Sequence, residues 1–180
     1  AGMQVDYHVP HRIDDGYGLT PAGVEKVHAR GSRLIVTVDN GIAATEAIAK
    51  ASTLGMEVIV TDHHKQEGEL PPACAIVNPN RKDNEYPFQG IAGVGVAYKL
   101  CCALAPRILS SDEADSFLQE ALDLVTLGTV ADMVPLVDEN RVLVALGLSR
   151  VASSKRAGVQ ALIEQARAKR DIDPTDIGFR

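Results

Sequence analysis

Short apolar runs recur along the first half of the chain and predict the strands of a sheet. The clearest is residues 34–38, LIVTV, whose continuous β-branched sequence is typical of a strand covered on both faces. This run stops at Asp39, where the sequence turns polar. Similar runs predict further strands at residues 3–9, 56–60 and 75–77.

Between these strands, apolar residues follow helical spacing. Thr20 and Pro21 supply a capping hydroxyl and a proline at the first helical position, which predicts a helix to about residue 30. A second helix is expected from Ala44 to Gly55. The alternation indicates parallel βαβ units, and hence an α/β fold with helices on both faces of a parallel sheet. A helical C-terminal part is expected to follow, with helices at 90–105, 112–131, 140–153 and 157–169.

Composition and charge exclude several classes of protein. Of the 180 residues, 46% are hydrophobic and 23% charged, which is typical of a globular domain and excludes a disordered chain or a fibre. No apolar run approaches the roughly 18 residues of a membrane span. The three cysteines form no CxxC pair, which indicates a cytoplasmic protein and excludes a zinc site built mainly of cysteine. A net charge of −6 argues against a broad basic surface for nucleic acid.

Residues with metal-binding side chains follow two of the predicted strands. Asp39 ends the first, and Asp62, His63 and His64 end the next, so all should lie at one edge of the sheet. Asp132 follows an apolar helix, where a charged side chain needs a partner or a metal. Carboxylate and imidazole without thiolate favour Mn²⁺, Mg²⁺ or Fe²⁺, and such ions make phosphoester hydrolysis the expected reaction.

Each of these features taken alone also has a structural explanation. Asp39 with the following Asn40 and Gly41 forms an ordinary turn sequence, and a histidine pair after a strand is often only solvated or hydrogen-bonded. Asp132 is also compatible with a helix-end residue that bonds backbone amides. The coincidence of all three features favours the metal site.

The motifs together resemble the RecJ-type exonucleases, which are specific for single-stranded DNA and belong to the DHH phosphoesterase superfamily. The tripeptide that names the superfamily stands at residues 62–64. Alone it is a weak signal, but further matches span nearly the whole chain in the family's order. They lie at residues 10–12, 16–19, 37–42, 60–64, 77–79, 93–100 and 128–136.

The resemblance implies a role for each candidate residue. Asp39 would bridge two metal ions, and His63 and Asp132 would complete the protein ligands of one of them. The second histidine of the motif, His64, would act at the scissile phosphate by stabilising charge or donating a proton. The remaining two residues, Asp62 and Arg12, would orient a histidine ring and hold the 5′-phosphate, respectively.

The family's first motif, an Asp-x-Asp pattern at the end of the first strand, supplies the remaining ligands of the two-metal site and is expected to lie upstream of residue 1. We therefore expect this chain to be the central fragment of a longer catalytic core. The expected domains are a phosphoesterase domain at 1–136, without its first strand, and a helical connection at 137–180 toward a second domain. Hydrolysis by this chain alone is expected to be very weak or absent.

The favoured function is part of a 5′→3′ exonuclease that hydrolyses single-stranded DNA in repair and recombination, with two Mn²⁺ or Mg²⁺ ions in the complete protein. Single-strand-binding protein is a candidate partner, and no membrane association is expected. Two alternatives remain. One is a phosphodiesterase for short oligonucleotides or cyclic dinucleotides, and the other is a non-catalytic scaffold.

Overall fold

The structure, a computed structural model, describes residues 4–166 and 172–179 of the chain. It divides into two compact units, Ala1–Gln89 and Gly90–Arg180. This division falls elsewhere than the domain boundary expected at residue 136, and that boundary stays a prediction. Among the described residues, no helix is both long and apolar enough to cross a membrane.

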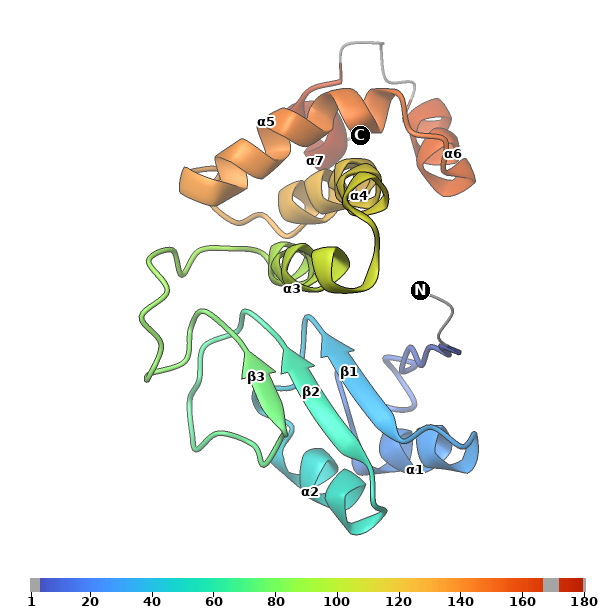
Figure 1. Cartoon of the computed structure of the whole chain (residues 1–180), viewed down its shortest axis with the longest axis vertical. Coiled ribbons are helices and arrows are strands. Elements are labelled where there is room, and N and C mark those ends of the chain that lie inside the picture. Colours follow the sequence, from blue (N-terminus) through green and yellow to red (C-terminus); the bar gives the residue numbers. More distant parts are fainter. Residues whose placement is uncertain (1–3, 167–171, 180) are drawn as a thin grey trace. The chain divides into compact units, whose positions relative to one another are not determined.

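The first unit is built on a parallel sheet in the order β1-β2-β3 (Figure 1). Its strands are β1 (Leu34–Val38), β2 (Glu57–Thr61) and β3 (Ala75–Val77), which confirms three of the predicted strands. Thr61 lies opposite Val38 on one side and Val77 on the other. The three strands therefore end level with one another, so the residues that follow them share one edge of the sheet.

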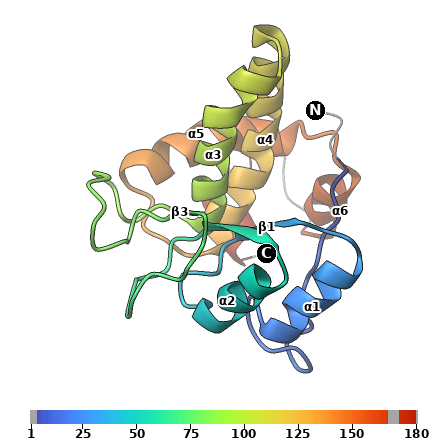
Figure 2. The same ribbon diagram turned by 60° about the horizontal axis from the view of Figure 1, so that its bottom comes forward.

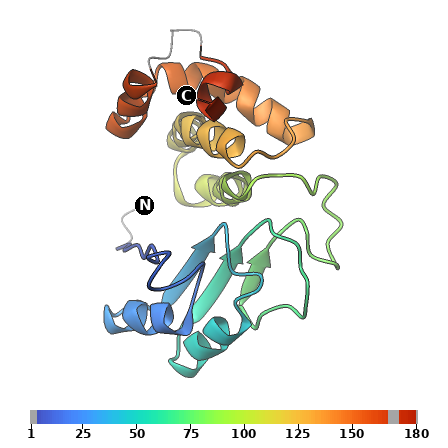
Figure 3. The ribbon, with the colours of Figure 1, turned by 180° about the vertical axis from the view of Figure 1, so that it is seen from behind.

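Two helices pack against the same face of this sheet (Figures 1 and 3). Helix α1 (Pro21–Ala29) begins as predicted, with the Thr20 hydroxyl accepting the Gly23 N–H at 3.1 Å. Helix α2 (Thr45–Thr53) connects β1 to β2 and completes a βαβ unit. The core between helices and sheet consists of buried aliphatic side chains from both layers, chiefly Val24, Ile35, Ala47, Ile48, Ala51, Val58 and Val60.

Two expectations about strands are wrong. Residues 4–9 form no strand, and Val5, Tyr7 and Val9 are highly exposed, while Met3 lies outside the described residues. Strand β1 is not covered on both faces, because every second residue from Leu34 to Val38 is about half exposed. An apolar run predicts that a segment is extended. Whether both faces of that strand are buried depends on neighbouring elements that the run does not specify.

The second unit is helical, as predicted. Its longest helices, α3 (Gly93–Ile108) and α4 (Ser111–Ala131), lie side by side (Figure 2). The remaining helices are α5 (Asp138–Ala152), α6 (Ala157–Gln165) and α7 (Pro174–Phe179). The last part of the helix expected at 157–169 lies outside the described residues. A small core of Leu122, Val125 and Leu143 joins α4 to α5, with Val94 and Tyr98 of α3 packed against it.

A glycine permits the close approach of α4 and α5. A Cβ atom on Gly147 would lie 2.5 Å from the Leu122 carbonyl oxygen and would collide with the Thr126 hydroxyl. Gly158 in α6 offers a matched control, because a Cβ there would have nothing within 4 Å.

We expect Gly147→Ala to lower the free energy of unfolding by about 3 kcal/mol, because the two helices must move apart. Gly158→Ala should instead raise it by about 0.5 kcal/mol, since alanine is the better helix former. Denaturant unfolding of both variants measures the difference. Equal stability of the Gly147→Ala variant and the unsubstituted chain would show that the helices do not meet here.

Candidate metal centre

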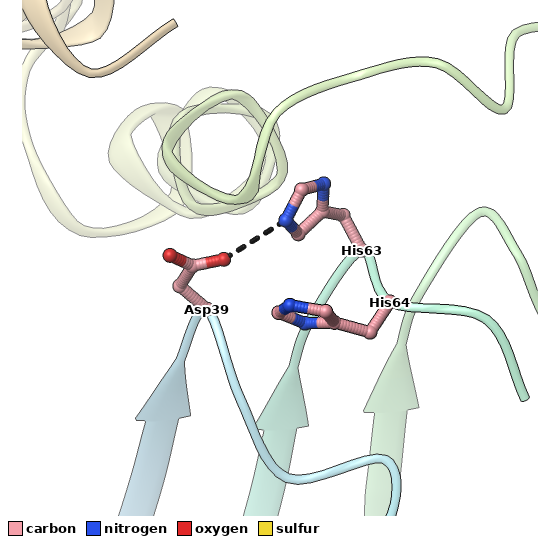
Figure 4. A group of neighbouring side chains, drawn as sticks. All are labelled: Asp39, His63 and His64. Carbon is pink, nitrogen blue, oxygen red and sulfur yellow. Dashed lines mark ion pairs between the residues drawn. The ribbon is translucent and has the colours of Figure 1, made fainter. Parts of the chain in front are cut away.

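Asp39, His63 and His64 come together at the carboxyl edge of the sheet (Figure 4). One potential ligand atom of each lies within 4.8 Å of the other two. The His63 ring points toward Asp39, and its Nε2 is 3.1 Å from a carboxylate oxygen. The two histidine rings meet edge to face, with centroids 4.7 Å apart. Asp39 lies 24 positions before His63 in sequence, and it meets the two histidines because β1 and β2 end side by side.

A sharp turn places Asp39 at this edge. Its N–H makes a 3.0 Å hydrogen bond to the Thr61 carbonyl, and its φ of 63° then takes the chain into the left-handed region. Gly41, with φ of 115°, brings the loop back over the strands, where a Cβ would lie 2.7 Å from the Thr37 hydroxyl. The chain therefore leaves the sheet abruptly, and the Asp39 side chain remains 52% exposed at the strand end.

Asp62 is the buried centre of the motif, with 1% of its surface exposed. Its carboxylate accepts the Ile42 N–H at 2.9 Å, which ties down the loop after β1. It also accepts the N–H groups of His63 at 2.7 Å and His64 at 3.2 Å, and it lies 2.6 Å from His64 Nδ1. Burial acts to raise the pKa of Asp62, but these hydrogen bonds outweigh it and hold the pKa below the usual value.

The ionised Asp62 fixes the tautomer of His64. A carboxylate only accepts hydrogen bonds, so the His64 Nδ1 that faces it must be the protonated nitrogen. In a neutral ring, Nε2 is then the basic nitrogen. The role expected for Asp62, orienting a histidine ring, is consistent with this contact to the His64 ring.

Arg12 is connected to the cluster through Tyr17. The Arg12 guanidinium carbon lies 5.6 Å from the centre of the Tyr17 ring. The Tyr17 hydroxyl donates to the Asp39 carbonyl at 3.3 Å, and the Tyr17 ring lies edge-on to His64 with centroids 6.3 Å apart. The phosphate-holding role expected for Arg12 stays a prediction.

Asp132 belongs to the second unit, where it is the C-terminal cap of α4. Its N–H donates to the Gly128 carbonyl at 3.0 Å, and the residue is exposed, as is Met133 beside it. The expectation that Asp132 needs a partner or a metal stays a prediction. The placement of the two units relative to each other is not determined, so the role of Asp132 as a ligand stays a prediction.

Two asparagines that were not predicted as site residues also belong to the site, although Asn78 lies in the family match at residues 77–79. Asn78 and Asn80 follow β3 and donate side-chain hydrogen bonds to the carbonyls of His64 and His63. Their position directly after the third strand, at the same edge as the other candidates, is the signal that could have identified them.

The donor set suits a hard or borderline divalent cation. A carboxylate oxygen and imidazole nitrogens converge, and no thiolate lies in the cluster. The exposed Asp39 and the half-exposed His64 leave the centre accessible from solvent, as a site that takes water and substrate requires.

Comparison with protein families gives a match to the DHH family, N-terminal domain, over residues 1–129. Among characterised proteins, the single-stranded-DNA-specific exonuclease RecJ of Salmonella typhimurium is 49% identical over 97% of this chain. The protein of the same name from Escherichia coli is 48% identical over 97% of this chain. In both cases the match covers 32% of the relative, so this chain spans about a third of their length.

Solved structures agree with these matches. A crystal structure of exonuclease RecJ bound to manganese covers 96% of this chain with a TM-score of 0.81 and 34% identity, over 42% of its own length. RecJ of Thermus thermophilus in complex with Mn²⁺ covers 89% with a TM-score of 0.73 and 33% identity, over 23% of its own length.

The network around Asp62 predicts a specific stability loss. Asp62→Asn replaces an ionised acceptor with an amide whose NH₂ group must face a donor, so we expect it to lower the free energy of unfolding by about 3 kcal/mol at pH 7 in chelator. Because the pKa of Asp62 is lowered on folding, its stabilisation is present above the unfolded-state pKa and is lost as the pH falls through the folded-state pKa. The difference in the free energy of unfolding between the variant and the parent should therefore become smaller as the pH falls.

Denaturant unfolding at pH 7 and at stepwise lower pH measures this difference. Asp115→Asn, on an exposed position of α4, is the control and should change stability little. A constant difference between the Asp62→Asn variant and the parent down to the lowest pH would contradict the assignment of an ionised Asp62.

Proposed function

Because this chain belongs to the DHH family, we propose that it forms part of the catalytic core of a metal-dependent exonuclease that degrades single-stranded DNA. The observation that carries the proposal is the convergence of Asp39, His63 and His64 at the carboxyl edge of the sheet. The proposal includes single-stranded DNA as the substrate, in line with the names of the RecJ relatives, and adds the 5′→3′ direction and a place in DNA repair and recombination.

Asp39 and His63 would hold a divalent ion, with Asp132 as a further ligand. Mn²⁺ or Mg²⁺ fits this donor set, and solved RecJ structures in complex with each ion are similar to this chain. When bound, such an ion polarises a phosphoryl oxygen and lowers the pKa of a coordinated water. A second ion in the complete protein would need further carboxylates, since none of the strands β1 to β3 of the described residues is followed by an Asp-x-Asp sequence.

His64 would act on the phosphate from its Nε2 side, since its Nδ1 is bonded to Asp62. In the doubly protonated ring, Nε2–H stabilises charge on the phosphate or donates its proton to the leaving oxygen as the phosphorus–oxygen bond breaks. The carboxylate of Asp62 supports that protonated ring and keeps it oriented.

Arg12 would hold the 5′-terminal phosphate of the strand. Its planar guanidinium suits bidentate contact with phosphate oxygens, and its exposed position beside Tyr17 is compatible with that role. The proposal also includes single-strand-binding protein as a partner, a cytoplasmic location, and residues 137–180 as a connection toward a second domain.

Replacing Asp39 tests the proposal in the complete gene product. The unsubstituted protein should release nucleotides from a 5′-phosphorylated single strand in Mn²⁺ and leave duplex DNA intact, as followed by gel electrophoresis. Asp39→Ala should lower the rate at least about 100-fold, because a metal ligand is lost. Asp14→Ala, in an exposed loop, is the control and should retain the parent rate.

A series of substrate lengths separates the alternatives. Preference for dinucleotides or cyclic dinucleotides over long strands would indicate the short-substrate phosphodiesterase. Absence of hydrolysis, together with equal Mn²⁺ binding by the parent and the Asp39→Ala variant, would indicate a scaffold.

The isolated 180-residue chain should bind Mn²⁺ but hydrolyse single-stranded DNA very weakly or not at all, because Asp39, His63 and Asp132 would supply the ligands of only one of two metal ions. Titration followed by electron paramagnetic resonance measures the binding, and Asp39→Ala should weaken it at least about tenfold. Vigorous Mn²⁺-dependent hydrolysis by the isolated chain would show that its own residues complete the catalytic site.

A further inference from the structure

We propose that Asn78 and Asn80 are positioning residues with separate tasks. Asn80 holds His63 in place for metal binding, and Asn78 holds His64 in place for the chemical step. This inference rests on the proposed function and concerns the same site.

The side chains of the two asparagines hydrogen-bond the segment after β2 to the segment after β3, beyond the last backbone hydrogen bond between them. The last backbone bond between these segments runs from the Asp62 N–H to the Val77 carbonyl at 3.1 Å. One residue further along, Asn80 Nδ2 donates to the His63 carbonyl at 2.6 Å. The next carbonyl, that of His64, accepts from Asn78 Nδ2 at 2.9 Å. Side-chain amides thus take the place of ladder N–H groups where the histidines leave the sheet.

The asparagines are themselves held in place before any ligand binds. Asn78 is 4% exposed, and its Oδ1 accepts the Asn80 N–H at 2.7 Å. Asn80 Nδ2 also donates to the Gln89 carbonyl at 3.0 Å. Asn84 braces the same loop by donating to the Pro79 carbonyl at 3.0 Å, but none of its hydrogen bonds reaches a histidine. Each histidine carbonyl therefore meets a donor whose own position is fixed.

The chemistry of the amide explains why asparagine suits both positions. Asn78 must donate to His64 and accept from Asn80 with one side chain, which an amide does and a carboxylate does not. Each bond fixes the peptide that follows a histidine and so limits how far that ring can turn. A catalytic constellation tolerates deviations of only about 0.5 Å, so such support should affect function more than stability.

The two tasks separate because the histidine rings face different partners. The His63 ring faces the carboxylate of Asp39, and the His64 ring faces Asp62. Loss of the hydrogen bond to the His63 carbonyl should therefore disturb the metal centre. Loss of the hydrogen bond to the His64 carbonyl should instead disturb the histidine ring that is assigned to the phosphate. A purely structural role in the loop would give no such division.

The test compares Asn80→Ala, Asn78→Ala and the matched control Asn84→Ala in the complete gene product. Mn²⁺ affinity is measured by electron paramagnetic resonance, and kcat and KM are measured on single-stranded DNA at saturating Mn²⁺. Asn80→Ala should raise the Kd for Mn²⁺ about tenfold and regain most of kcat at saturation. Asn78→Ala should lower kcat about tenfold with the Kd for Mn²⁺ within about twofold of the parent. Asn84→Ala should change neither quantity.

Isosteric variants cover the case in which an alanine variant does not fold. Asn78→Asp and Asn80→Asp keep the side-chain shape but remove the donor, and Asn84→Asp introduces the same charge in the same loop. The same division between Kd and kcat is expected, measured relative to Asn84→Asp.

The inference is overturned if the Asn78 and Asn80 variants match the Asn84 controls, or if both lower Mn²⁺ affinity and kcat alike. Failure of the proposed function is distinguishable from failure of this inference, because the unsubstituted protein would then show no Mn²⁺-dependent hydrolysis. That result would also overturn the task of Asn78, while the Mn²⁺ affinities would still decide the task of Asn80.

Discussion

The buried carboxylate of Asp62 is the interaction on which the rest of the site depends. It accepts hydrogen bonds from the loop after β1, through Ile42, and from both histidines after β2. A buried charge is tolerated only when it is well bonded, and these donors meet that need. The same bonds hold the loop after β1 against the segment that carries the histidines.

The carboxyl ends of the parallel strands position the other groups of the site around this carboxylate. The level ends of β1, β2 and β3 bring three loops to one edge, and each loop contributes a different kind of group. The first supplies the carboxylate of Asp39, the second the imidazoles, and the third the amides of Asn78 and Asn80. The arrangement explains how a short motif acquires a defined geometry, since its neighbours come from segments that are distant in sequence.

The local elements were predicted well where one segment decides its own conformation. Strands β1 and β3 and the start of α1 follow from β-branched runs and from the Thr20 cap. The strand expected at 3–9 fails because an extended sequence needs a partner strand, and the described residues 4–9 have none.

The sequence by itself determined the fold class, the family and the candidate metal-binding residues, because these depend on residue types, their order and local hydrogen-bonding preferences. Only the tertiary structure decided which of those residues meet. Their meeting depends on strand register and on side chains such as Asn80, which reaches 17 residues back to His63. Contacts between residues so far apart in sequence arise from the packing of whole elements, and no local pattern of residues predicts them.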